Sequence, residues 1–354
     1  MMRAWLERWL QEVWYGPGIG KWLLLPLSVV YGLAVAVRRW LYSGGVLKQA
    51  HLPVPVVVVG NLTAGGTGKT PVTIWLACAL RDRGFAPGIV SRGYGGSRSD
   101  APMRVDAMSD PAVVGDEPVL LARRTGLPVC VDRNRVRAAE MLVEDGVDLV
   151  IADDGLQHLR LGRSYEICVV DGSRGFGNHL PLPAGPMRDT LKRLCEVDQV
   201  LVNGPVTAPC PTAAEQNAMA FELRATEARR LNGSLVRPLA AFAGRTVHAV
   251  AAIGNPARFF RQLRTADIQV IEHALPDHAP LTPADVDFAD AFDVLMTEKD
   301  AVKLGNRLGD RYWYVPVEVI ADPAHAAPWL DQMVSRLRGA TISPAVERRA
   351  ESPG

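Results

Sequence analysis

The chain has 354 residues, of which 48% are apolar and 22% charged, and its formal net charge is +1. A chain of this length predicts two domains, each able to bury its own core. The near-balanced charge excludes a strongly basic surface that wraps nucleic acid, so we expect no nucleic-acid partner.

The first fifty residues depart from this average composition. They contain six basic residues against two acidic ones and five of the eight tryptophans, a residue that prefers the headgroup level of a bilayer. Residues 22–37 carry no charge and would span about 24 Å as a helix, against a hydrocarbon core of ~30 Å. Because Pro26 and Gly32 also interrupt this run, we expect residues 1–50 to form a helical segment associated with a membrane surface. A full span and a helix packed into the protein core are the alternatives.

Residues 54–80 combine an apolar run, a glycine-rich turn and a second apolar run. The pattern predicts a buried strand over 54–59, a turn, and a helix that begins at Lys69. In such a loop backbone N–H groups, the positive end of the helix dipole and the Lys69 ammonium surround phosphate oxygens, and the Thr70 hydroxyl can bind Mg²⁺. The sequence therefore predicts a nucleoside triphosphate site formed by Asn61, Thr63, Gly65, Gly66, Thr67, Gly68, Lys69 and Thr70.

The loop departs from the strict G-x-x-x-x-G-K-[ST] pattern at one position, because Thr63 stands where the pattern has its first glycine. Gly65, Gly66 and Gly68 still supply a permissive backbone, and the strand, turn and helix follow in the right order. We interpret the segment as a variant phosphate-binding loop.

Strands and helices alternate along the rest of the chain, which predicts an α/β fold. Residues 51–205 are expected to form a P-loop NTPase-type core with a doubly wound, mostly parallel sheet. After a Pro-rich stretch near 204–211, residues 206–342 are expected to form a second, smaller α/β domain that closes over the site. Residues 343–354 are polar and are expected to be a disordered tail. The predicted strands are 87–91, 128–131, 149–152, 166–170, 199–202, 218–223, 246–253, 269–272, 294–297 and 312–317, and the predicted helices are 119–124, 133–144, 257–263 and one from Pro283.

Asp153 and Asp154 directly follow the strand predicted over 149–152. Phosphoryl transfer needs Mg²⁺ held between the hydroxyl of the phosphate-binding loop and a carboxylate at the end of a neighbouring strand. The sequence therefore predicts that one or both of these aspartates bind the ion.

Two further residues, Arg92 and His158, lie where they could reach the same site, and Asp116 is a third candidate. Arg92 opens a basic glycine loop after a predicted strand, and such loops line the ligand crevice of doubly wound sheets. His158 closely follows the tandem aspartates. Asp116 lies in a turn that leads into the helix predicted over 119–124, where an acidic residue usually only favours the helix N-terminus. Residues 297–300 (Thr-Glu-Lys-Asp) differ from the guanine-reading N/T-K-x-D motif by a lysine one place late, so we do not assign them to base recognition.

Seven segments spread over nearly the whole chain form a further pattern. They are GNLTAGGTGKTP (60–71), SRGYGG (91–96), GDEP (115–118), ADDGLQH (152–158), LPAGPMRD (182–189), DHAPLT (277–282) and TEKDAVKL (297–304). Together they resemble the tetraacyldisaccharide 4′-kinase family of lipid A biosynthesis. The resemblance implies transfer of the γ-phosphate of ATP to the 4′-hydroxyl of a tetraacylated disaccharide 1-phosphate, at the cytoplasmic face of the inner membrane. The basic, aromatic N-terminus suits such a lipid substrate.

The resemblance also implies a role for each matching residue. Lys69 and Thr70 become the phosphate and Mg²⁺ ligands, and Asp153 and Asp154 complete the metal site. Asp116 becomes the candidate general base on the sugar hydroxyl, tuned by His278, which would have to swing in from the second domain. His158 and Arg188 become candidates for binding the substrate or the transferred phosphate. We also assign Arg92, in its basic glycine loop, to substrate binding.

One alternative comes from another class of protein. A P-loop GTPase or ATPase could act as a conformational switch that binds a protein partner. The degenerate guanine-reading motif and the lipid-directed N-terminus argue against this alternative.

Overall fold

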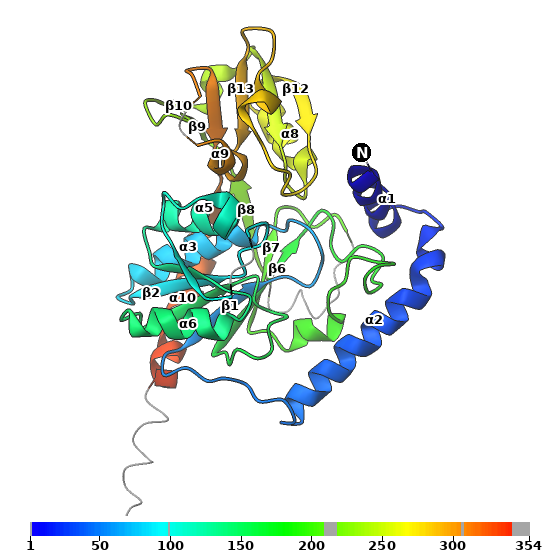
Figure 1. Ribbon diagram of the computed structural model, residues 1–354, viewed down its shortest axis with the longest axis vertical. Helices are drawn as coiled ribbons and strands as arrows, with labels where there is room; N and C mark the ends of the chain where they lie inside the picture. The colour runs from blue at the N-terminus through cyan, green and yellow to red at the C-terminus, as the bar shows by residue number, and fades with distance from the viewer. Residues whose placement is uncertain (1, 98–99, 209–217, 306–307, 342–354) are drawn as a thin grey trace, which may run out of the picture.

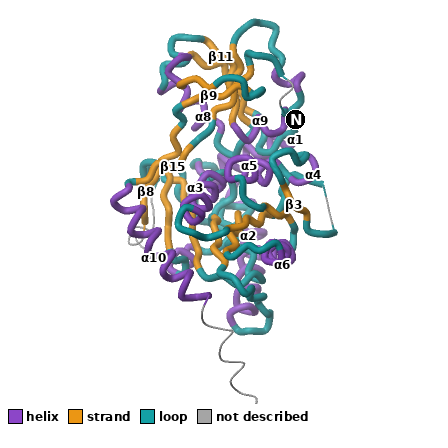
Figure 2. The backbone as a smooth tube through the Cα atoms, turned by 90° about the vertical axis from the view of Figure 1, so that its left-hand side faces the viewer, coloured by secondary structure: helices purple, strands orange, loops and turns teal. Residues whose placement is uncertain are grey.

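A computed structural model of the protein describes residues 2–97, 100–208, 218–305 and 308–341. Two α/β units lie one above the other, and the two N-terminal helices lie along one side (Figures 1 and 2). The lower unit contains the larger sheet.

The larger sheet has nine strands, and most of its pairings are parallel. Only β3 against β4 and β15 against β8 are antiparallel among the described pairs. The central strands read as continuous apolar runs because helices cover both faces of the sheet. Their spatial order is β15 (Glu318–Ala321), β8 (Ala218–Arg224), β7 (Gln199–Asn203), β6 (Tyr165–Asp171), β1 (Val56–Gly60), β5 (Leu149–Asp153), β2 (Pro87–Ser91), β4 (Val129–Val131) and β3 (Met103–Val105).

Alternate side chains of β1 point to opposite faces of this sheet and enter separate cores. Val57 and Val59 pack with α3 (Lys69–Arg81), α5 (Asp116–Thr125) and α10 (Pro323–Thr341). Val56 and Val58 pack with α6 (Arg135–Glu144) on the other face. The remaining short helices of this unit are α4 (Pro111–Val114) and the 3₁₀ helix η1 (Leu191–Cys195).

The smaller sheet has six strands and its own apolar core, in which Phe242, Phe260 and Trp313 are fully buried. Its spatial order is β10 (Val236–Pro238), β9 (Glu227–Arg230), β14 (Tyr312–Val315), β13 (Asp293–Thr297), β11 (Thr246–Ala251) and β12 (Gln269–Ala274). Its helices are α8 (Pro256–Thr265), α9 (Glu298–Leu304), η2 (Leu239–Phe242) and η3 (Pro283–Val286).

The sheets divide the chain differently from the domain expected over 206–342. β8, β15 and α10 all belong to the larger unit, so the chain crosses between the units twice, after β8 and before β15. Pairing between strands that are distant in the chain determines which unit a segment joins, and local composition does not reveal this pairing. The helix expected from Pro283 is one 3₁₀ turn with a capping box between Thr282 and Asp285. The tail predicted over 343–354 lies outside the described residues.

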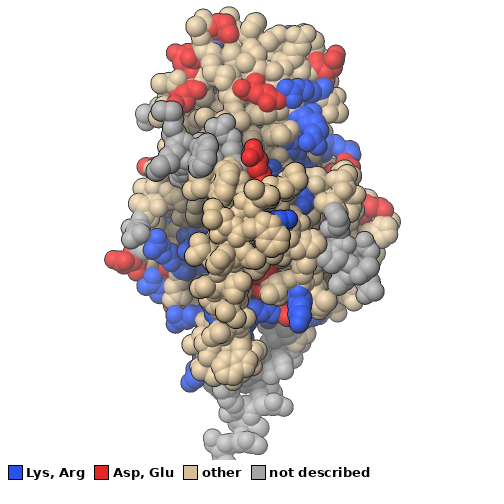
Figure 3. All heavy atoms as spheres, turned by 90° about the vertical axis from the view of Figure 1, so that its right-hand side faces the viewer, with Lys and Arg blue, Asp and Glu red and all other residues tan. Residues whose placement is uncertain are grey.

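The N-terminal segment forms α1 (Met2–Tyr15) and α2 (Gly20–Ser43). One face of α2 contacts the larger unit: the Ser28 hydroxyl accepts a hydrogen bond from the Ala184 amide at 2.8 Å, and the Tyr31 hydroxyl donates to the Arg188 carbonyl at 3.1 Å. The other face is apolar and exposed, and Figure 3 shows a largely uncharged surface on this side of the molecule. α2 is long and apolar enough to cross a membrane by length and composition alone. It is not a buried core helix. Its exposed residues include Trp22, Leu23, Leu27, Val30, Leu33 and Trp40.

Candidate active site

The phosphate-binding loop connects β1 to α3 in the geometry that a phosphate cradle requires. Gly65 and Gly68 adopt φ values of +110° and +99°, which side chains other than glycine rarely tolerate. The Asn61 amide donates to the Gly65 carbonyl at 3.3 Å, and the Asn203 amide donates to the Thr67 carbonyl at 3.0 Å. Both asparagine side chains therefore fix the backbone of the loop by binding its carbonyl groups.

A second loop supports the first. Thr63 pairs with Met187 as an isolated bridge, and the Ala64 amide donates to the Pro186 carbonyl at 2.7 Å. At the position where the strict pattern has a glycine, Thr63 therefore pairs with the backbone of this second loop. Asn61 and Thr63 are both buried and shape the loop, whereas residues 64–70 face the cavity.

Asp154 lies opposite Lys69 at the end of β5. Its carboxylate is 3.5 Å from the Lys69 ammonium and 3.0 Å from the Arg188 guanidinium. Burial raises the pKa of Asp154, but the positive charges of Lys69, Arg188 and Arg135 outweigh it and hold that pKa well below its usual range. The residue has φ +49°, a conformation held by Arg135, which donates to the carbonyls of Asp153 and Asp154. This carboxylate is therefore ionised and faces the cavity.

Asp153 lies beneath Asp154 and is only 1% exposed. Its carboxylate accepts a hydrogen bond from the Thr73 hydroxyl at 2.9 Å. Burial, followed by the negative charges of Glu117 and Asp154, raises the pKa of Asp153 to about 7. The two successive carboxylates lie at the end of β5 beside Lys69, and a bound cation would relieve the repulsion between their charges.

Asp116 and His278 form a contact between the two units. The His278 Nδ1 atom lies 3.1 Å from the Asp116 carboxylate, and the Lys299 ammonium lies 3.1 Å from His278 Nε2. Since an ammonium only donates, Nε2 accepts and the imidazole is neutral, with its proton on Nδ1 directed at Asp116. The contact that the resemblance implied is therefore already formed in this structure.

The surroundings of Asp116 stabilise its charged form. Burial raises the pKa of Asp116, but the hydrogen bond from His278 and the charges of Lys299 and Lys303 lower it to about 2. The Oδ2 atom accepts no hydrogen bond from the described residues, and the Lys303 ammonium lies 3.6 Å away. One oxygen of this buried carboxylate is thus left without a hydrogen-bond donor among the described residues.

Lys69, Asp154, Arg188, His278 and Lys299 line one cavity of about 1250 Å³ between the two units. Asp116 and Asp153 are buried beside these lining residues. The N-terminal helices contribute Trp14, Tyr31 and Arg38 to its wall. Nine cationic residues line it against four acidic ones, so the cavity is suited to a polyanion. The cationic residues are Arg38, Lys69, Arg92, Arg133, Arg135, Arg174, Arg188, Arg258 and Lys299, and the acidic ones are Glu117, Asp154, Asp277 and Glu298.

His158 also lines this cavity. Burial, followed by the charge of Arg135, lowers the pKa of His158 to about 4, so its ring is neutral near pH 7. Its Nε2 atom is buried without a hydrogen-bond partner among the described residues. A neutral ring with a free nitrogen can bind a hydroxyl or a phosphate oxygen.

Sequence reasoning missed three residues of the site. Glu117 and Lys299 form an ion pair at 3.1 Å across the two units, and Arg135 orients the backbone of the tandem aspartates. Lys299 belongs to the segment that superficially resembles a guanine-reading motif, but it contacts His278 and Glu117. Its position directly after β13, where the ligand crevice of a parallel sheet lies, is the signal that could have identified it.

Comparison with known proteins identifies the family to which this chain is similar. A model of the family described as tetraacyldisaccharide-1-P 4′-kinase matches residues 20–335. A tetraacyldisaccharide 4′-kinase of Nitrosococcus oceani is 49% identical over 307 residues, covering 86% of this chain and 88% of the relative. The protein of the same name from Pseudomonas aeruginosa is 42% identical over 330 residues, covering 93% and 97%.

A solved structure has the same fold. It is a crystal structure of LpxK from Aquifex aeolicus in complex with ATP, with a TM-score of 0.71 and 26% sequence identity. The match covers 89% of this chain and 99% of that chain. None of these findings supports the switch alternative.

Proposed function

The chain belongs to the tetraacyldisaccharide-1-P 4′-kinase family, and from this membership we propose how its residues perform the reaction. The protein is an ATP-dependent kinase that transfers the γ-phosphate of ATP to the 4′-hydroxyl of a tetraacyldisaccharide 1-phosphate in lipid A biosynthesis. The observation that supports the mechanism best is the arrangement of the Asp116–His278 pair, Lys69 and Asp154 around one cation-rich cavity.

The loop of residues 64–70 and Lys69 bind the phosphates of ATP. Lys69 neutralises phosphate charge, and the glycines let the backbone amides approach phosphate oxygens closely. The buried Oγ1 atom of Thr67, which has no hydrogen-bond partner among the described residues, also suits this binding.

Mg²⁺ fits the oxygen ligands gathered here. Among the described residues no three His, Cys, Asp or Glu side chains converge to hold a metal, so the ion would take further ligands from substrate phosphates and water. The Thr70 hydroxyl and the carboxylates of Asp153 and Asp154 would hold it. Burial, followed by the charges of Glu117 and Asp154, raises the pKa of Asp153, and a bound cation would favour its charged form. When bound, Mg²⁺ neutralises charge that develops on the phosphates.

Asp116 accepts the proton of the 4′-hydroxyl. As the hydroxyl oxygen bonds to the γ-phosphorus, the bond from phosphorus to the leaving oxygen of ADP breaks and the proton passes to the carboxylate. A carboxylate with a pKa near 2 is a weak base, so Asp116 mainly orients the hydroxyl and takes its proton late, which suits the loose transition state of phosphoryl transfer. His278 keeps the carboxylate ionised and oriented.

Arg92, His158 and Arg188 bind the substrate and the transferred phosphate. All three line the cavity, and Arg188 lies within 3.1 Å of Asp154. A planar guanidinium matches phosphate oxygens, so Arg188 stabilises the negative charge on the phosphoryl group during its transfer.

The acylated substrate enters from the cytoplasmic face of the inner membrane. The exposed apolar face belongs to the same helix, α2, that contributes Tyr31 and Arg38 to the cavity wall, and the side of the molecule on which α2 lies is largely uncharged (Figure 3). A helix with one apolar face can lie in the interfacial region, and this would bring the acyl chains and the sugar to the site together.

The decisive experiment is transfer of radiolabel from [γ-³²P]ATP to a defined tetraacyldisaccharide 1-phosphate in mixed micelles. We expect Mg²⁺-dependent label in the lipid, and loss of that label in the Lys69→Ala variant. A rate of ATP hydrolysis that does not change with the acylated disaccharide but rises with an added protein partner would instead favour a conformational switch.

A further inference from the structure

Arg39 lies on α2, outside the cavity wall, and binds two acidic side chains of the larger unit. Its Nη1 atom donates to both carboxylate oxygens of Asp189 at 3.0 and 3.2 Å, and its Nη2 atom donates to those of Glu196 at 2.5 and 2.7 Å. The Asp189 side chain is only 5% exposed. Such two-point contacts fix direction as well as distance.

The first partner, Asp189, is joined covalently to Arg188. The Arg188 amide donates to the Leu62 carbonyl at 2.7 Å, next to the phosphate-binding loop, and its carbonyl accepts from the Tyr31 hydroxyl of α2. Its guanidinium binds Asp154. The backbone that carries Arg188 is therefore held by α2 at two successive residues, through Tyr31 and Arg39.

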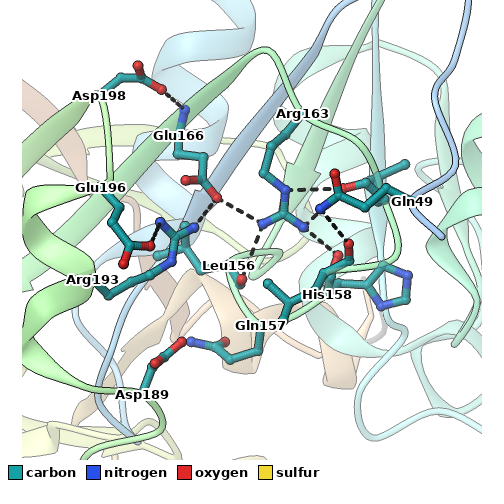
Figure 4. A network of polar contacts seen from close by, with 12 residues as sticks. Gln49, Leu156, Gln157, His158, Arg163, Glu166, Asp189, Arg193, Glu196 and Asp198 are labelled. Carbon is teal, nitrogen blue, oxygen red and sulfur yellow. Dashed lines mark hydrogen bonds and ion pairs between the residues drawn. The ribbon is translucent and has the colours of Figure 1, made fainter. Parts of the chain in front are cut away.

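The second partner, Glu196, leads to the loop of His158, as Figure 4 shows. Arg193 bonds to both Glu196 and the buried Glu166. Glu166 also accepts from Arg163 at 2.8 Å, and Arg163 donates to the carbonyls of Leu156 and His158. The Arg39 guanidinium is thus connected to two loops of the cavity. Through Asp189 it reaches the loop of Arg188, and through Glu196 it reaches the loop of His158.

We propose that Arg39 is a positioning residue for phosphoryl transfer: through Asp189 it holds Arg188 against the phosphate site. The position of α2 on the larger unit then determines where the Arg188 guanidinium lies. This inference rests on the proposed function, in which Arg188 contacts the transferred phosphate. It gives α2 a second role besides contact with lipid. An ion pair that served only to anchor the helix would act on binding of the lipid and not on the rate of transfer.

The test compares Arg39→Ala, Arg39→Lys and Asp189→Asn in the radiolabel assay at saturating lipid. We expect kcat to fall by about tenfold to a hundredfold in Arg39→Ala and Asp189→Asn, the scale of a misplacement of about 1 Å, with the KM for ATP nearly unchanged. Arg39→Lys keeps the charge but loses the two-point contact, so its kcat should be intermediate. Arg104→Ala is the matched control, because Arg104 makes an exposed two-point contact with Asp145 at 2.7 and 2.8 Å.

A double-mutant comparison separates positioning from anchoring. If Arg39 acts through Arg188, Arg39→Ala should lower kcat by less than about twofold when Arg188 is already alanine. Unchanged kcat in Arg39→Ala, or a full further loss in the Arg188→Ala background, would overturn the inference. If Arg39→Ala does not fold, Asp189→Asn decides by the same criteria. Absence of lipid phosphorylation by the unsubstituted enzyme would reject the proposed function itself.

Discussion

Two aspartates of the cavity have opposite pKa shifts because their neighbours differ. Asp116 faces His278 and two lysines, which lower its pKa to about 2, whereas Asp153 is buried beside two carboxylates, which helps to raise its pKa to about 7. At neutral pH Asp116 is therefore always ionised and able to accept a proton. The charge on Asp153 is the one that a nearby cation would stabilise.

Asp116→Ala should lower kcat by roughly a hundredfold or more, the scale of lost general-base catalysis, and leave ATP affinity nearly unchanged. Since the pKa of Asp116 lies far below 5, the pH–rate profile between pH 5 and 8 should contain no acid limb from this group. Steady-state kinetics over this pH range measure kcat and the profile, and nucleotide titration measures the affinity for ATP. A variant that turns over at the normal rate would remove Asp116 from the reaction.

At the scale of elements, α2 has two faces with different tasks. Ser28, Tyr31 and Arg39 contact the larger unit, whereas Leu23, Leu27 and Val30 are exposed by 77%, 60% and 65%. Deleting residues 1–40, which we expect to release the protein from membranes, would also remove the first set of contacts. Substitution of the exposed face alone is therefore the cleaner test of the membrane proposal.

The triple variant Leu23→Gln/Leu27→Gln/Val30→Gln should bind vesicles of inner-membrane phospholipids at least about tenfold more weakly, because burial of even one large apolar side chain contributes about 1.5–3 kcal/mol. Its thermal midpoint should change little, since these side chains are already exposed. Vesicle co-sedimentation measures the binding. A control with Met108, Val206 and Val236 changed to glutamine alters exposed apolar residues elsewhere. Equal binding by both triple variants would mean that another surface contacts the membrane.

At the scale of the whole molecule, the two units meet at glycines. A Cβ atom on Gly254 would lie 2.6 Å from the backbone nitrogen of Gly66 in the phosphate-binding loop. The Gly254 carbonyl also accepts a hydrogen bond from Arg174 at 3.1 Å, and Arg258 binds Asn203 behind the same loop. The smaller unit therefore closes onto the phosphate-binding loop as well as onto Asp116.

Gly254→Ala should force the units apart, because the clash is with backbone and no flexible side chain can move aside. We expect kcat/KM to fall by about tenfold or more through displacement of His278 and the phosphate-binding loop. Gly309→Ala is the control, since a Cβ atom there meets no atom within 4 Å. Wild-type kcat/KM in Gly254→Ala would show that this close approach does not matter for turnover.

The sequence by itself determined the features that depend on neighbours along the chain. The strand, glycine loop and helix around Lys69, the aspartates at the end of β5 and the apolar helix near the N-terminus are local patterns, so periodicity and motif spacing identify them. Only the tertiary structure decided which strands share a sheet, that Lys299 reaches His278, and that Arg39 joins α2 to Arg188 and to the loop of His158. These contacts link residues more than twenty positions apart in the chain, and their energies depend on burial and distance, which arise only when the chain has folded.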